Sequence, residues 1–71
     1  MKILLSSPES EARLVLTDET DHNTLLSSEE VGLEIYDKDN KIDARVVVLV
    51  PELRAAMIAF GNRFEMRRDV T

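Results

Sequence analysis

His22 is the single histidine of the chain, and the carboxylates of Asp18, Glu19 and Asp21 lie within four residues of it. An imidazole among carboxylates could exchange protons or share a metal ion with them. A catalytic metal usually needs three protein ligands in fixed geometry, and a polar loop without periodicity does not supply that. We therefore interpret the cluster as a solvated acidic loop.

Two further groups of residues have the composition of a site without its spacing. Asp37, Asp39 and Asp43 could begin a calcium loop, but Ile42 stands where that loop needs glycine and Val48 where it needs a bidentate glutamate. Four serines could form a catalytic triad with His22 and an aspartate: Ser6, Ser7, Ser27 and Ser28. None of the four has a glycine-framed turn or an oxyanion hole beside it. We expect no catalytic residue, no cofactor and no metal, and we predict that the protein is not an enzyme.

The acidic residues are a candidate partner-binding surface. The net charge is −5, with −7 on residues 1–53 and +2 on residues 54–71. Such a charge is also about what ordinary solubility requires. Alternate residues of a strand lie about 6–7 Å apart, which is close to the spacing of phosphates, so an acidic ridge could block the basic groove of a nucleic-acid-binding protein. The residues of this predicted ridge are Asp18, Glu19, Asp21, Glu30, Glu34, Asp37 and Asp39.

Direct nucleic-acid binding would depend on four arginines near the C-terminus: Arg54, Arg63, Arg67 and Arg68. They flank an apolar helical stripe on both edges and do not form one basic face. Two of the three aromatic residues are needed in the core, which leaves no stacking platform. We favour the interpretation that the arginine stems cover the rim of the core.

The C-terminal quarter predicts a helix that opens at Pro51 and Glu52, residue types that suit the first helical turn. One stripe of it is apolar and is expected to pack on a sheet: Leu53, Ala56, Met57, Phe60 and Phe64. The far side of the helix carries no charge and is a second candidate partner-binding surface: Ala55, Ile58, Ala59, Asn62 and Met66. Small residues let another backbone approach, so we expect a homodimer through this side.

Residues 30–50 predict a β-hairpin, because alternate residues are apolar on both sides of turn residues at Asp39 and Asn40. In the preferred register Leu33 faces Val46, and Glu34 faces Arg45 as an ion pair. The other expected pairs are Val31 with Val48, Ile35 with Ala44 and Lys38 with Lys41. A slip by one residue would mix the two faces.

Residues 2–6 and 12–17 predict two further strands, and residues 18–24 a polar loop. Residues 27–30 could instead cap a short helical turn. The predicted fold class is α+β: a single domain of residues 1–71, with a three- or four-stranded mainly antiparallel sheet and one C-terminal helix packed on one face. Val47 and Leu49 would then point to the uncovered face.

The chain of 71 residues has no cysteine, and its longest apolar run is far too short to span a bilayer. We therefore expect a cytoplasmic protein without a membrane partner. We predict a non-enzymatic protein-interaction module, a regulator or inhibitor that occupies a partner protein's surface, of the kind that phages and mobile elements encode. The alternatives are a nucleic-acid mimic and a direct nucleic-acid binder. The residues carry no motif that resembles a known family.

Overall fold

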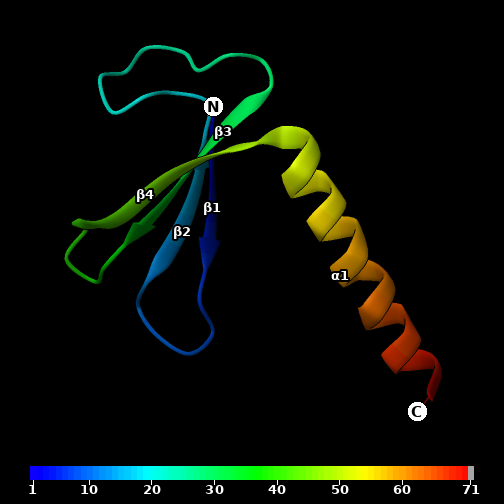
Figure 1. Ribbon diagram of the computed structural model, residues 1–71. Coiled ribbons are helices and arrows are strands. Elements are labelled where there is room, and N and C mark those ends of the chain that lie inside the picture. The colour runs from blue at the N-terminus through cyan, green and yellow to red at the C-terminus, as the bar shows by residue number, and fades with distance from the viewer. Residues whose placement is uncertain (71) are drawn as a thin grey trace.

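Four antiparallel strands follow one another across a single sheet, in the order β1-β2-β3-β4, and one helix follows them (Figure 1). The computed structural model describes the backbone of residues 1–70 and the side chains of residues 1–63. The elements are β1 (Lys2–Ser6), β2 (Arg13–Thr17), β3 (Glu30–Tyr36), β4 (Ile42–Leu49) and α1 (Val50–Val70). The predicted α+β class is thus confirmed, with four strands and with the N-terminal pair arranged as a simple meander.

The β3–β4 hairpin has the register that the side-chain pattern predicts. Leu33 pairs with Val46 and Glu34 with Arg45, and the expected partners of Val31 and Ile35 are also observed. A bulge after Ile35 then pairs Tyr36 with Ile42, so the predicted contact of Lys38 with Lys41 is not formed. The cause is Asp37, whose carboxylate accepts hydrogen bonds from the amides of Asp39 and Lys41, both at 2.9 Å, and closes the turn early.

A twelve-residue loop, residues 18–29, joins β2 to β3 and folds over one end of the sheet (Figure 1). Its two arms meet at a bridge between Glu19 and Leu25, and its tip has Asn23 at a φ of 62°. The amide of Leu26 donates to the carbonyl of Asp18 at 2.8 Å. Residues 27–30 form a turn into β3, so the alternative of a short helical turn there is wrong.

The helix begins without any connecting residue, because β4 ends at Leu49 and α1 starts at Val50. It leaves the end of the sheet and diverges from it (Figure 1). The amide of Val50 donates to the carbonyl of Glu29 at 2.7 Å, which ties the first turn to the start of β3. Among the described residues, no helix is long and apolar enough to cross a membrane.

The predicted packing of the helix on its own sheet is not formed. Met57 and Phe60 remain 62% and 63% exposed, and Leu53 is only half-buried. Ala56 is exposed as well, and the side chain of Phe64 lies outside the described residues. The physical reason is the direct passage from strand to helix: a helix that starts immediately after the last strand residue has no loop with which to turn back across the sheet. Among the described side chains, Val15 is the one buried apolar residue.

Candidate functional site: an exposed apolar sheet face

One face of the sheet is entirely apolar. The strand register places ten residues there, two or three from each strand: Ile3, Leu5, Leu14, Leu16, Val31, Leu33, Ile35, Ala44, Val46 and Val48. Two unbroken rows cross all four strands. The first row is Ile3, Leu16, Leu33 and Val46, and the second is Leu5, Leu14, Ile35 and Ala44. We call these ten residues the apolar sheet face.

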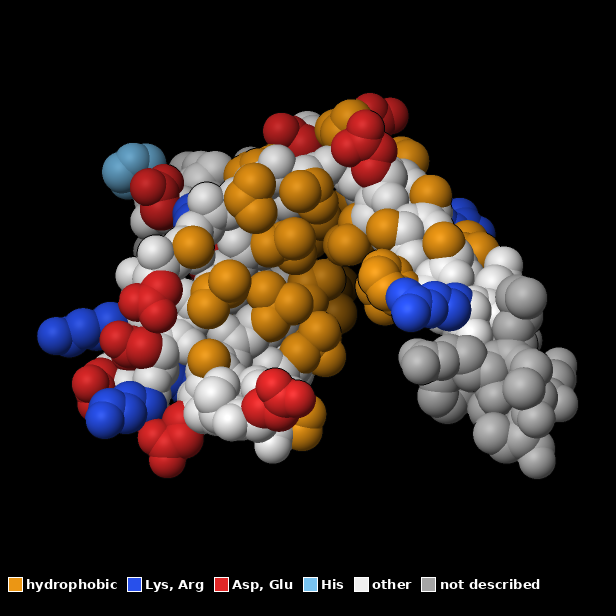
Figure 2. Space-filling model, turned by 60° about the horizontal axis from the view of Figure 1, so that its bottom comes forward, with side chains coloured by type: hydrophobic (Ala, Val, Ile, Leu, Met, Phe, Trp, Pro, Cys, Tyr) orange, Lys and Arg blue, Asp and Glu red, His pale blue; other side chains and the backbone are white. Residues whose placement is uncertain are grey.

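The apolar sheet face is open to solvent. None of its ten members, all of them described, is buried, and Val46 at the centre of β4 is 54% exposed. Figure 2 shows hydrophobic side chains gathered over the sheet and continuing onto the first turns of the helix. In a monomeric fold such a face would be the core, because a sheet normally buries one face against a second layer.

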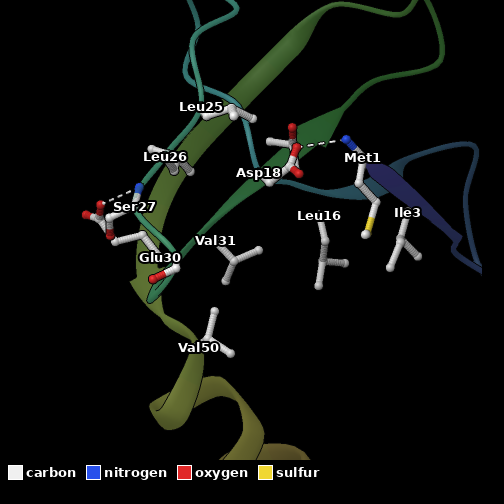
Figure 3. Close-up of a pocket in the computed structure, with 12 residues that line it drawn as sticks. Met1, Ile3, Leu16, Asp18, Leu25, Leu26, Ser27, Glu30, Val31 and Val50 are labelled. Atoms are coloured by element: carbon white, nitrogen blue, oxygen red, sulfur yellow. Dashed lines mark hydrogen bonds and ion pairs between the residues drawn. The ribbon is translucent and has the colours of Figure 1, made fainter.

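Two hollows lie at opposite ends of this face. The larger, of about 490 Å³, is bounded by Ile3, Leu16 and Val31 of the sheet, by Leu25 and Leu26 of the loop, and by Val50 of the helix (Figure 3). Its lining also includes polar residues: Thr17, Asp18, Ser27, Ser28 and Glu30. The smaller, of about 330 Å³, is lined by residues that include Leu5, Leu14 and Ile35. Side chains from another polypeptide could enter both hollows without displacing any part of this chain.

The other face of the sheet is polar at its centre, and its charges are paired. Arg45 donates to the carboxylate of Glu34 and, at 2.6 Å, to the carbonyl of Glu19, while the Tyr36 hydroxyl donates to Glu34 at 3.1 Å. The Glu34 side chain is 6% exposed and that of Arg45 19%. Burial, and then the hydrogen bond to Glu34, raise the pKa of Tyr36 above its usual value of 10.0.

Gly32 makes this network possible. A Cβ at that position would lie 3.0 Å from the methyl group of Thr17 and 3.2 Å from a guanidinium nitrogen of Arg45. Without a side chain there, Arg45 can extend over β3 to reach the loop. The network therefore holds the loop on the sheet. Val47 and Leu49 lie on this second face, as predicted, since they pair with Gly32 and Glu30.

The structure does not bring the predicted acidic ridge together. Asp18, Glu19, Asp21 and Glu30 lie at the loop end of the sheet, and Asp37 and Asp39 lie at the hairpin tip, one strand length away. Glu34 is buried between them. Asp18 accepts a hydrogen bond from the Met1 ammonium at 2.8 Å, which holds its pKa below the usual range.

His22 is exposed at the loop tip, with its Nε2 3.7 Å from a carboxylate oxygen of Asp21. Among the described residues, no three His, Cys, Asp or Glu side chains are close enough to hold a metal ion together. The histidine is therefore not part of a built site in this part of the chain.

The predicted helix surface is exposed as far as it is described: Ala55, Ile58, Ala59 and Asn62. The side chains of Met66, Arg67 and Arg68 lie outside the described residues, while Arg54 and Arg63 are exposed on the helix. From Arg54 to Arg63 every described side chain of α1 is thus exposed, and the helix meets the sheet only at its first turn.

Sequence reasoning did not select the apolar sheet face as a site, because it assigned those residues to a core under the helix. The signal was available in the absence of any turn residue between the predicted strand, ending at Val50, and the helix at Pro51. Comparison with protein-family models, with curated proteins and with solved structures finds no match to this chain. The candidate site therefore rests on the geometry of these residues alone.

Proposed function

We propose that this chain is a protein-interaction module that is not an enzyme and whose apolar sheet face is covered by another polypeptide. The observation that carries the proposal is a set of ten contiguous apolar side chains on one face of the sheet, five of them exposed, five half-buried and none buried. Soluble monomers rarely expose contiguous apolar patches larger than a few hundred Å², and larger ones mark interaction surfaces.

The character of the surface supports a polypeptide as the occupant. A small-molecule pocket usually encloses its ligand and places a few polar groups at fixed points. The apolar sheet face is instead broad and open, and its two hollows continue it at the ends. This is the form of a sheet that lacks its second layer.

The role that fits such a module is that of a regulator or inhibitor, which acts by occupying its partner's surface in the cytoplasm. The nucleic-acid-mimic and nucleic-acid-binding alternatives stay predictions of the sequence. No arrangement of the described carboxylates or of Arg54 and Arg63 favours them, because the carboxylates are divided between two ends of the sheet.

Site-specific photocrosslinking in cells that make the protein tests the proposal. A benzophenone amino acid at Val46 lies on the apolar sheet face, and the same residue at Val47 lies on the opposite face of the same strand. We expect crosslinked polypeptide at Val46 and little at Val47, although Val47 is 42% exposed. Absence of a crosslink at Val46, or equal crosslinking at both positions, would overturn the proposal.

A further inference from the structure

The chain exposes far more surface than a compact monomer of its mass. Its accessible surface is 6003 Å², whereas a folded monomer of 8.1 kDa exposes about 4,500 Å². Its radius of gyration is 14.5 Å, compared with about 11 Å for a compact chain of this length. The excess of roughly 1,500 Å² is larger than the about 800 Å² that each partner buries in a standard interface. A stable dimer could bury all of it.

The chain has two complementary apolar surfaces that do not contact each other. The apolar sheet face lacks a covering layer, and the apolar stripe of α1, represented by Leu53, Met57 and Phe60, lacks a sheet. A helix of 21 residues is about 30 Å long, and four strands span about 14 Å between their outer axes, so one helix can cross the whole face. The net charges are also opposite, since residues 1–49 carry −6 and residues 50–71, which include α1, carry +1.

The helix cannot make this contact within its own chain. Leu49 ends β4 and Val50 begins α1, and the hydrogen bond from Val50 to the carbonyl of Glu29 fixes the direction in which the helix leaves. A short connection between two elements that would otherwise pack together is the condition that favours exchange between identical chains.

We propose that the polypeptide on the apolar sheet face is a second copy of this chain, in a twofold dimer whose helices are exchanged. The helix of each chain lies on the sheet of its partner, so that the apolar sheet face and the apolar stripe of α1 are both buried in a closed pair. This inference rests on the proposed function, because it names the polypeptide that covers the face.

The mass in solution, measured by light scattering, is the first test. We expect about 16 kDa, twice the 8.1 kDa of one chain, and a shift to about 8 kDa for Val46→Glu and for Phe60→Glu. Val47→Glu and Ile58→Glu are the matched controls, because each lies beside the corresponding variant and on the opposite side of the strand or helix. Both controls should remain dimers. An 8 kDa wild type, or loss of the dimer in Ile58→Glu alone, would overturn helix exchange.

Cysteine crosslinking tests the exchange in variants that keep the interface. The chain has no cysteine, so Val46→Cys in one copy and Met57→Cys in another can be mixed after unfolding and refolding together. A short bismaleimide should join unlike chains in this mixture and should join few in a mixture of Val46→Cys with Ile58→Cys. Equal yields in the two mixtures, or predominant joining of Val46→Cys to itself, would contradict the proposed arrangement.

Lengthening the connection should also give a monomer, but one whose apolar surfaces are buried, unlike the monomer of an interface variant. Six glycine and serine residues inserted between Leu49 and Val50 should let α1 turn back onto its own sheet and produce an 8 kDa monomer that buries Met57 and Phe60. A lengthened chain that remains wholly dimeric under dilution would count against exchange. The two proposals fail separately: a monomeric wild type whose Val46 photocrosslinks to a different protein overturns the exchange and retains the interaction module.

Discussion

Replacement of Arg45 by methionine is expected to destabilise the fold strongly, because it leaves a buried carboxylate without its cation. The guanidinium of Arg45 donates to Glu34 and to the carbonyl of Glu19. With Arg45 gone, the Tyr36 hydroxyl at 3.1 Å is the remaining donor to the Glu34 carboxylate among the described side chains. Glu34 cannot turn to water without leaving the sheet face, since its side chain is only 6% exposed.

The magnitude follows from the burial of the pair. Removing one partner of a buried ion pair costs about 3–5 kcal/mol, mostly as the penalty of the charge left behind. A chain of this length has a total unfolding free energy of about 4–11 kcal/mol. With a urea dependence near 1 kcal/mol per molar, the unfolding midpoint of Arg45→Met should fall by about 3 M or more.

Urea unfolding followed by circular dichroism measures this loss, with all variants at one protein concentration. The double variant Glu34→Gln/Arg45→Met removes the charge together with its partner and should recover at least half of the loss. Lys41→Met, an exposed cation on the same hairpin, should stay within about 0.5 kcal/mol of wild type. A loss below about 1 kcal/mol in Arg45→Met would refute the reasoning, as would a double variant as unstable as the single one.

Three further outcomes are expected. Gly32→Ala should lower the unfolding free energy by about 1–3 kcal/mol, because the added methyl group would crowd Thr17 and Arg45. Gly61→Ala, with open space around the added methyl group, should raise the unfolding free energy by about 1 kcal/mol. Urea unfolding of the two variants shows whether the two changes have opposite signs. Tyr36 is the only tyrosine and there is no tryptophan, so ultraviolet titration should show the pKa of Tyr36 above 10.0, and a lower pKa in Glu34→Gln. A raised pKa means that the folded state favours the neutral phenol. The stabilisation of the fold that results is complete below pH 10 and is lost as the pH rises through the folded pKa. Asn40, at a φ of 64°, should tolerate glycine, while Asn40→Val should cost about 1–3 kcal/mol in the same unfolding assay.

The register of the hairpin from Val31 to Ile35 could be predicted because three independent signals agree there. Alternation of Val31, Leu33 and Ile35 fixes the faces, Asn40 tolerates the positive φ of the turn, and the pairing of Glu34 with Arg45 selects the register. The bulge after Ile35 escaped prediction. The bulge depends on a carboxylate that accepts two backbone hydrogen bonds at once. Such local hydrogen bonds compete with strand pairing, and which of the two wins can be judged only when the geometry is known.

The N-terminal strands were predicted with nearly their observed bounds, but their position in the sheet was not. Short apolar runs such as residues 2–6 identify a strand without stating its neighbour. The meander brings Leu14 and Leu16 into line with the hairpin, and the apolar sheet face exists only after that alignment. Glu34 and Arg45 were correctly paired, but their burial was not predicted. It depends on the space that Gly32 leaves for Arg45 and on the position of the loop, which become known only once the chain is folded.

The helix shows most clearly what the pattern of apolar residues cannot predict. The stripe of Leu53, Met57 and Phe60 specifies that this side of α1 packs against something apolar, and the apolar sheet face specifies the complementary surface. Neither pattern states whether the two surfaces belong to one chain or to two. That choice depends on the connection, and here Leu49 and Val50 leave none. The apolar sheet face is therefore uncovered because the chain has no loop between β4 and α1, although the side chains of the sheet and the helix suit each other. In the proposed dimer the same residues form a complete core, because a second chain supplies the helix.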